Sequence, residues 1–177
     1  MPQPPACCAR PDLPEASDEA LLRRVLGLAR RSREEGNHPF AALVVAPGGA
    51  ILSEALNAHR ASPLEHAEMN ALRIALTEGG VTDLARATLY SSAEPCAMCA
   101  GGIYWSGIGR LVYGLSERRL LEITGANPAN PTLSLPCREV FARGQRAIEV
   151  IGPLLEDEAA EVHHGFWAHA FGAYRAR

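Results

Sequence analysis

Two short clusters constrain this chain more than any other feature. The first is His66-Ala67-Glu68 and the second is Pro95-Cys96-Ala97-Met98-Cys99, with residues 69–94 between them. An imidazole and two thiols are typical zinc ligands, and cysteines spaced Cys-x-x-Cys can bind one ion from a single helical turn. Three protein ligands leave the fourth tetrahedral position open for water, which is typical of a catalytic zinc site.

The hydrophobic pattern predicts that each cluster lies at the start of a helix. His66 and Glu68 fall in the first turn of one helix, and Cys96 opens another that runs to about residue 105. A helix N-terminus stabilises thiolates through its dipole and its free N–H groups. If the two helices lie side by side on one face of a sheet, their N-termini meet and His66, Cys96 and Cys99 can bind the same ion.

The rest of the chain alternates between strands and helices. Strands are predicted over 40–46, 50–57, 87–92, 110–115 and 147–151, and further helices over 17–36, 117–123, 136–143 and from 156 onward. An initial hairpin followed by strand–helix alternation indicates a three-layer α/β/α domain with a five-stranded mixed sheet. We interpret residues 17–177 as a single domain and the proline-rich residues 1–16 as a disordered or loosely ordered tail.

Composition narrows the functional classes. The 177 residues carry a net charge of −3, which disfavours nucleic acid as a partner because phosphate contacts need basic residues. No apolar run is long enough to span a membrane, and no signal peptide is visible. The number of cysteines, five, is odd, and no secretion signal is visible. Both observations favour a cytoplasmic location with free or metal-bound thiols. The cysteines are Cys7, Cys8, Cys96, Cys99 and Cys137.

Glu68 is the candidate proton carrier. Zinc lowers the pKa of a bound water to about 7 and so provides hydroxide at neutral pH. Glu68 follows His66 closely without being needed as a ligand, so it can move protons between the water, a ring nitrogen and departing ammonia. Two other interpretations stay open at this point. Cys137 could close a structural Cys3His site, and the Cys-x-x-Cys pair could be a redox pair.

Together the clusters match the zinc deaminase signature, His-x-Glu followed by Pro-Cys-x-x-Cys. The chain resembles the cytidine deaminase-like superfamily, and residues 91–105 are most similar to bacterial guanine deaminases. The resemblance implies strand order 2-1-3-4-5, zinc on His66, Cys96 and Cys99, Glu68 as proton shuttle, and a homodimer. It also implies that Asn57 binds the substrate, although a turn role for this residue has equal weight. The residues expected around the substrate are Phe40, Asn57, Ala67, Glu94, Phe166 and Trp167.

One segment departs from the guanine deaminase pattern. Where those enzymes carry Gly-Phe-Asp-Asp, this chain has Thr124-Gly125-Ala126-Asn127 and lacks the acid. The predicted activity is zinc-dependent hydrolytic deamination of a free nucleobase or related heterocycle, with guanine or another aminopurine as the first choice. A triazine, cytosine, a nucleoside and tRNA adenosine remain alternatives.

The aromatic residues near two helix ends allow more than one role. Phe166 and Trp167 could stack on a base, but the favoured interpretation is that they pack the last helix while His163 and His164 face solvent. Tyr104 and Trp105 are expected to lie in the core or at a dimer contact.

Overall fold

The computed structural model describes residues 16–78, 84–125, 127 and 130–168. The predicted tail, including Cys7 and Cys8, lies outside the described residues except for its last position.

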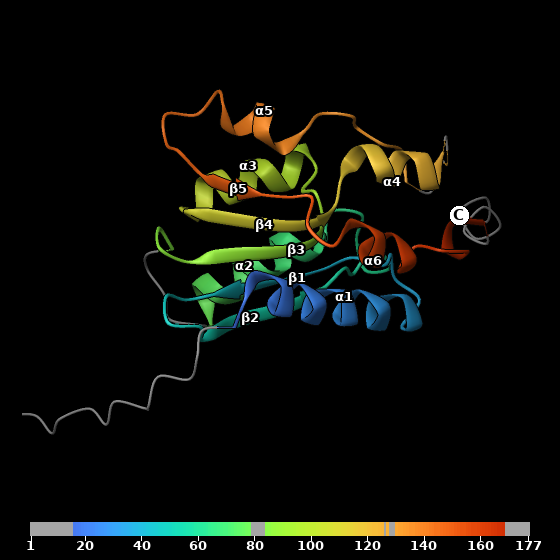
Figure 1. Ribbon diagram of the computed structural model, residues 1–177, viewed down its shortest axis with the longest axis horizontal. Helices are drawn as coiled ribbons and strands as arrows, with labels where there is room; N and C mark the ends of the chain where they lie inside the picture. The colour runs from blue at the N-terminus through green and yellow to red at the C-terminus, as the bar shows by residue number, and fades with distance from the viewer. Residues whose placement is uncertain (1–15, 79–83, 126, 128–129, 169–177) are drawn as a thin grey trace, which may run out of the picture.

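A five-stranded mixed sheet forms the centre of the fold, in the order β2-β1-β3-β4-β5 (Figure 1). β1 pairs antiparallel with β2 and β3, whereas β3, β4 and β5 run parallel. The predicted fold class and strand order are therefore confirmed. The strands are β1 (Ala41–Val45), β2 (Ile51–Leu56), β3 (Thr88–Ala93), β4 (Arg110–Leu115) and β5 (Glu149–Ile151).

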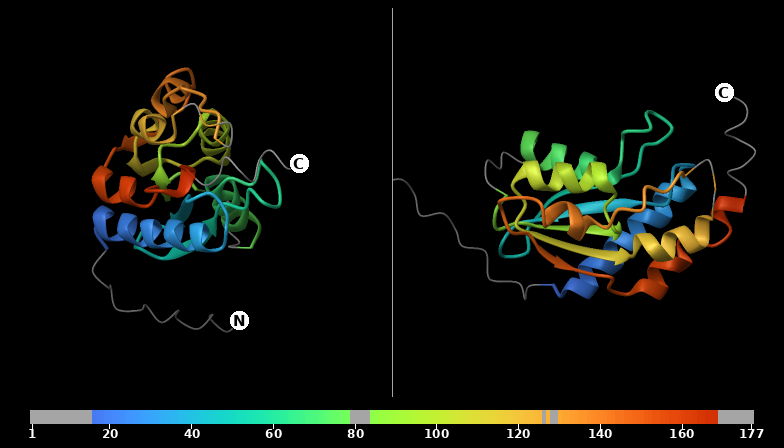
Figure 2. Two further views of the ribbon diagram at one scale, coloured as in Figure 1. Left: turned by 90° about the vertical axis from the view of Figure 1, so that its right-hand side faces the viewer. Right: turned by 90° about the horizontal axis from the view of Figure 1, so that it is seen from above.

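Helices cover both faces of the sheet and create two hydrophobic cores (Figure 2). On one face lie α2 (Ala67–Thr77), α3 (Ala97–Ser106) and α5 (Cys137–Phe141). On the other face lie α1 (Asp18–Glu34) and α6 (Glu156–Glu161), while α4 (Glu117–Thr124) follows β4. Because β1 is buried along its whole length, its residues contribute to both cores, as expected for a strand inside a three-layer sandwich.

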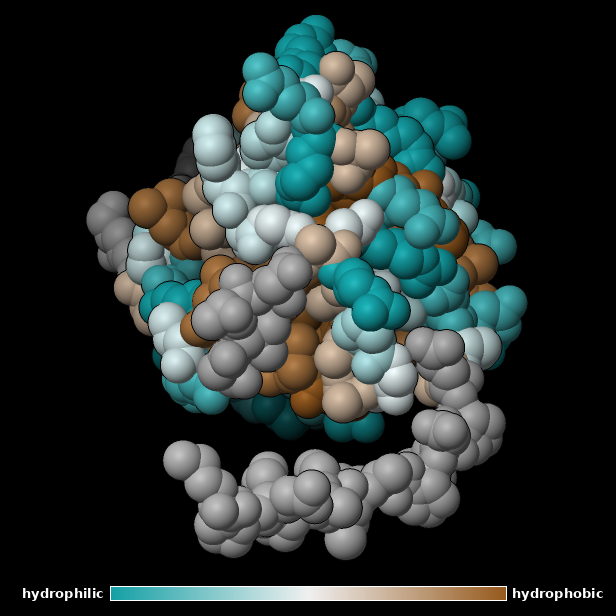
Figure 3. Space-filling view, turned by 90° about the vertical axis from the view of Figure 1, so that its left-hand side faces the viewer, coloured by the Kyte–Doolittle hydropathy of each residue, from teal (hydrophilic) through white to brown (hydrophobic). Residues whose placement is uncertain are grey.

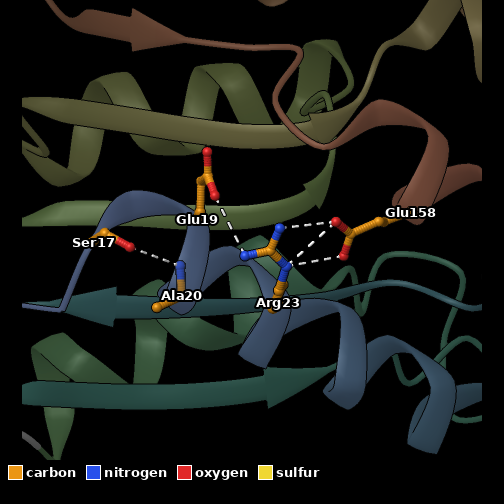
Figure 4. Close-up of polar contacts among 5 residues, drawn as sticks. All are labelled: Ser17, Glu19, Ala20, Arg23 and Glu158. Carbon is orange, nitrogen blue, oxygen red and sulfur yellow. Dashed lines mark hydrogen bonds and ion pairs between the residues drawn. The ribbon is translucent and has the colours of Figure 1, made fainter.

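The first helix illustrates how local sequence and distant packing agree. Ser17 caps α1 by accepting a hydrogen bond from the Ala20 N–H at 3.2 Å, as its position before two acids predicts. Its apolar stripe is buried against the sheet. Arg23 on its outer face forms an ion pair of 3.0 Å with Glu158 of α6 (Figure 4), which links the two helices of this layer.

The carboxyl ends of β3 and β4 define the functional end of the sheet. Ala93 pairs with Leu115 at the last register position, and the Glu94 N–H donates to the Leu115 carbonyl at 2.7 Å. The chain then enters α3 after β3 and α4 after β4. Ligand sites in open α/β sheets lie outside such strand ends. Figure 3 views the opposite end of the molecule, where hydrophobic and hydrophilic residues are interspersed.

Two details of the sequence prediction need correction. Trp105 is 85% exposed, which excludes the core and leaves a dimer contact as the prediction for it, whereas Tyr104 is half-buried and its hydroxyl accepts from the Gln145 N–H. The last strand is shorter than predicted, because residues 147 and 148 precede its first ladder pair. Among the described helices, none combines the length and apolar character that crossing a bilayer requires.

Candidate metal centre and catalytic site

The structure brings His66, Cys96 and Cys99 together. The His66 Nδ1 lies 3.6 Å from the Cys96 Sγ and 3.5 Å from the Cys99 Sγ, and the three ligand atoms lie within 4.8 Å of one another. Nitrogen and sulfur ligands at normal zinc distances in a tetrahedral site are about 3.6 Å apart. The two thiols and the imidazole are thus already spaced for one zinc ion, and the chemistry of this donor set also fits zinc.

Two helix starts position these ligands, as predicted. His66 is the N-cap of α2 and Cys96 is the N-cap of α3, while Cys99 lies one turn into α3 and is fully buried. Neither N-cap side chain bonds its own helix, which leaves both groups directed to other partners. α2 and α3 pack beside each other, so their first turns meet at the end of the sheet.

Cys137 does not join this group. Within the described parts of the chain, His66, Cys96 and Cys99 form the one set of three potential metal-binding residues whose ligand atoms converge. Cys137 is fully buried, and burial is the main cause of its raised thiol pKa. The closed Cys3His interpretation is therefore wrong, and the site has three protein ligands, which is the catalytic form.

The protein's own hydrogen bonds prepare one thiolate. The pKa of Cys96 is lowered to about 4, first because the Cys99 thiol donates to it and then because His66 does. The pKa of Cys99 is raised, since it is the donor of that pair and is buried. The pKa of His66 is raised by its hydrogen bond with Cys96. A cation at this position is needed to deprotonate the second thiol.

Glu68 lies against the ligands with its carboxylate held in a fixed position. Its Oε1 accepts a hydrogen bond of 2.9 Å from the Ser91 hydroxyl, and its Oε2 accepts from the Cys99 thiol at 3.5 Å. The side chain is buried, and burial is the first cause of its raised pKa. A carboxyl group with a raised pKa beside a metal site can both accept and return a proton, as general acid–base chemistry requires.

Glu94 occupies a different position from the one expected. Its Oε2 accepts from the Glu117 N–H at 3.1 Å and its Oε1 from the Cys137 N–H at 3.0 Å. Each of these N–H groups opens a helix, α4 or α5, where backbone donors lack partners within the helix. The Glu94 carboxylate therefore joins the metal loop to two helix starts.

Asn57 has the turn role that the sequence left open. Its Oδ1 accepts from the His59 N–H at 2.9 Å, which forms the turn between β2 and the loop to α2. Its Nδ2 makes no hydrogen bond within the part of the chain that the structure describes. Ala67 is fully buried at the first position of α2, so only its backbone N–H is suited to face a ligand.

A cluster of six rings, here called the aromatic cluster, lies at the same end of the sheet as the imidazole ligand. It comprises His38, Phe40, His59, His163, Phe166 and Trp167. His38 stacks on His59 with ring centroids 4.0 Å apart and meets Trp167 edge-on at 5.1 Å. Burial, followed by the charges of His59 and His66, lowers the pKa of His38 to about 3, so its ring is neutral at pH 7.

The last segment packs more tightly than expected. Trp167 is buried, and its indole Nε1 donates to the His163 Nδ1 at 3.2 Å. His163 is only 1% exposed, so the prediction that it faces solvent is wrong, whereas His164 is exposed as predicted. Burial lowers the pKa of His163 to about 3 and keeps the ring neutral, which suits its role as an acceptor.

Three residues near the site were not singled out by the sequence analysis. Ser91 holds Glu68, His38 contributes to the aromatic cluster, and Glu117 begins α4 beside Glu94. Ser91 carried a weak signal, because a polar residue in a strand that is otherwise buried often faces a site. His38 and Glu117 carried none, since their places depend on how separate segments pack.

A cavity of about 440 Å³ lies elsewhere, between α5 and β5, and contains none of the candidate site residues. It is lined by Arg138, Phe141, Ala142, Ala147, Ile148 and Val150.

Comparisons with known proteins agree with this geometry. The cytidine and deoxycytidylate deaminase zinc-binding region matches residues 15–115. A probable cytosine deaminase of Schizosaccharomyces pombe is 38% identical over 85% of this chain and 92% of its own length. A guanine deaminase of Bacillus subtilis is 41% identical over 50% of this chain and 58% of its own. A tRNA-specific adenosine deaminase of Bacillus subtilis is 33% identical over 85% of this chain and 88% of its own.

Solved structures share the fold as well. A crystal structure of a variant of NE0047 in complex with 8-azaguanine has a TM-score of 0.69 and 31% identity, covering 86% of this chain and 85% of that one. The matched region spans both clusters, and the convergence of His66, Cys96 and Cys99 fits the zinc-binding region that the family model describes. The chain belongs to the cytidine and deoxycytidylate deaminase zinc-binding family.

Proposed function

We propose that this protein is a zinc-dependent hydrolytic deaminase of a free nucleobase, with guanine or another aminopurine as its substrate. One observation carries the proposal. Glu68 is buried against a three-ligand site that fits zinc, and the Ser91 hydroxyl holds its carboxylate there. A proton carrier at that position has a use in hydrolysis and none in a structural site, which needs a fourth protein ligand.

In the proposed reaction, three residues bind the metal and Glu68 transfers protons. His66, Cys96 and Cys99 bind one zinc ion per subunit, and zinc when bound makes a water acidic enough to attack at neutral pH. Glu68 accepts one proton of the attacking water and passes it to the ring nitrogen beside the amine-bearing carbon. It then accepts the remaining proton of that oxygen and passes it to the departing amine. The heterocycle gains a carbonyl oxygen and loses ammonia, so atoms and protons balance.

Several features support a small ring as the substrate. His38 of the aromatic cluster lies within range of the charge of His66, and the Asn57 Nδ2 is available as a donor at the same end of the sheet. NE0047, with which this chain shares its fold, has been crystallised with 8-azaguanine and with 2,6-diaminopurine. The net charge of −3 disfavours a tRNA substrate.

Cytosine is a second candidate. The S. pombe relative, described as a probable cytosine deaminase, matches over almost its full length. Its 38% identity extends beyond the zinc-binding region into the segments that follow β4.

An ammonia-release screen tests the proposal. The purified zinc-loaded protein is assayed with guanine, other aminopurines, cytosine, triazines, nucleosides and a tRNA anticodon stem. Release from a free base is expected, and release from the stem alone would refute the proposal. Glu68→Gln should keep zinc, measured by elemental analysis, and lose nearly all turnover. Loss of zinc together with turnover would assign Glu68 a structural role instead.

The predicted homodimer stays part of the proposal and rests on the resemblance. Sedimentation equilibrium measures the mass directly, and a monomer of 18.9 kDa at assay concentrations would refute it.

A further inference from the structure

Glu117 is a carboxylate near the metal centre that the proposed reaction does not use. It is the first residue of α4, after β4 ends at Leu115, just as Cys96 follows β3 after Ala93. Because β3 and β4 are parallel neighbours, both residues emerge at the same edge of the sheet. The hydrogen bond from the Glu117 N–H to Glu94 fixes the start of α4 against the metal loop.

The side chain of Glu117 lies in an unfavourable electrostatic position. It is half-buried, and the negative charges that act on it belong to Cys96, Glu94 and Glu68. Burial is the first cause of its raised pKa. Its carboxylate forms neither a hydrogen bond nor an ion pair within the described residues. A half-buried carboxylate without a partner costs free energy, and such groups gather at binding sites.

The helix dipole explains only part of this arrangement. An acid at the first position of a helix is favourable because it faces the free N–H groups. That effect operates equally well when the carboxylate points into solvent, where desolvation costs nothing. Glu122 on the same helix shows the usual arrangement of an acid, since its side chain is exposed to solvent and forms an ion pair with Arg118 at 3.6 Å. Glu117 is therefore half-buried near the metal centre at a cost that the stability of α4 does not require.

A carboxylate accepts hydrogen bonds and does not donate them, so its complement on a substrate is an N–H group. In guanine, the carbon that bears the amine is flanked by a ring N–H on one side and by an unprotonated ring nitrogen on the other. In cytosine, the corresponding carbon is flanked by an unprotonated nitrogen and a C–H. Only the guanine type offers one nitrogen for Glu68 to protonate and an adjacent N–H for a second carboxylate.

We infer that Glu117 is a substrate-binding residue that determines specificity by accepting the ring N–H beside the amine-bearing carbon. It thereby selects guanine-type bases over cytosine. This inference rests on the proposed function, because it names the edge of the base that is recognised at the proposed deaminase site. Glu94 acts as a positioning residue, since its carboxylate holds the start of α4 and hence Glu117.

The test compares Glu117→Gln and Glu117→Asp with the matched control Glu122→Gln on the same helix. The first readout is calorimetric binding of 8-azaguanine, which carries both the amine and the adjacent ring N–H. Glutamine at this position keeps an acceptor oxygen but loses the charge, and losing the charge-assisted part of a hydrogen bond weakens binding about ten-fold. Glu117→Gln should show that loss, Glu117→Asp should recover part of it, and Glu122→Gln should bind like the parent.

The second readout is the ratio of kcat/KM for guanine to kcat/KM for cytosine. Glu117→Gln should lower this ratio about ten-fold or more, mainly through the KM for guanine. Equal 8-azaguanine binding by Glu117→Gln and the parent would overturn the inference, and so would a parent that deaminates cytosine in preference to guanine. Both of these results leave the proposed deaminase activity intact. The proposed function is refuted only if none of the free bases releases ammonia.

Discussion

Replacing Ser91 by alanine tests whether the position of Glu68 matters as much as its presence. Ser91 is 1% exposed, and its hydroxyl donates to the Glu68 Oε1 at 2.9 Å. A hydrogen bond to a charged group contributes about 1.5–3 kcal/mol. If the bond acts only to hold the proton carrier, its loss lowers kcat about 10- to 150-fold, at 1.36 kcal/mol for each factor of ten.

The adjacent Ser92 provides the matched control. It is 2% exposed, and its hydroxyl accepts from the Ala41 N–H at 3.1 Å, on the side of the sheet away from the metal ligands. Ser92→Ala should cost about 1 kcal/mol of unfolding free energy and leave kcat close to that of the parent. Both variants are assayed for steady-state turnover, zinc content and urea unfolding.

The two serines then separate catalysis from stability. The expected pattern is normal zinc in both, with a large loss of kcat only in Ser91→Ala. A kcat for Ser91→Ala within two-fold of the parent, with zinc retained, would refute the argument that Ser91 positions the carboxylate. An equal loss in Ser92→Ala would assign the effect to general damage of β3.

Two further predictions concern stability and zinc content. Asp18 accepts hydrogen bonds from Arg110 at 2.9 and 2.6 Å, and these lower the pKa of Asp18 below 3.8. Asp18→Asn should therefore lower the unfolding free energy by about 1–3 kcal/mol at pH 7. The difference should persist above about pH 4 and shrink as the pH falls through the folded-state pKa. A difference in urea unfolding that does not change with pH would refute the ion-pair explanation. Cys137→Ala should leave one zinc per chain by elemental analysis, since Cys137 is outside the ligand group, and a loss of zinc would restore it as a ligand.

Much of the fold and all of the metal centre could be predicted because their causes are local. The His66 and Cys96 clusters can be recognised in the sequence as short motifs at helix starts. Ser17 caps α1 through a hydrogen bond with the Ala20 N–H, only three residues away. Alternation of strands and helices predicts a layered α/β sheet even when the exact bounds of each element are not known. The strand order came from the resemblance, and the structure agrees with it.

The failures share a different physical origin. His163 was expected in solvent because a histidine near a chain end is ordinarily exposed, yet its acceptor nitrogen is satisfied by Trp167 and its ring by Phe40, from a distant segment. The partners of Glu94 were not predicted either, because the two helix starts that donate to its oxygens lie more than twenty residues away in the chain. Such partners leave no periodic or spaced pattern that a sequence displays.

This contrast explains why the reaction type could be predicted more easily than the substrate. The candidate zinc ligands and Glu68 lie in two short segments, so their spacing can be recognised in the sequence as a motif. The groups available to read a base come from separate parts of the chain: Asn57 after β2, Glu117 after β4, and the aromatic cluster around His38. Each of them has an ordinary structural explanation when considered alone, as a turn residue, a helix start or a packed ring. Only their convergence at one end of the sheet distinguishes a binding site from these roles, and convergence is a property of the folded chain. The choice between guanine and cytosine should therefore depend on Glu117 more than on any residue of the motif.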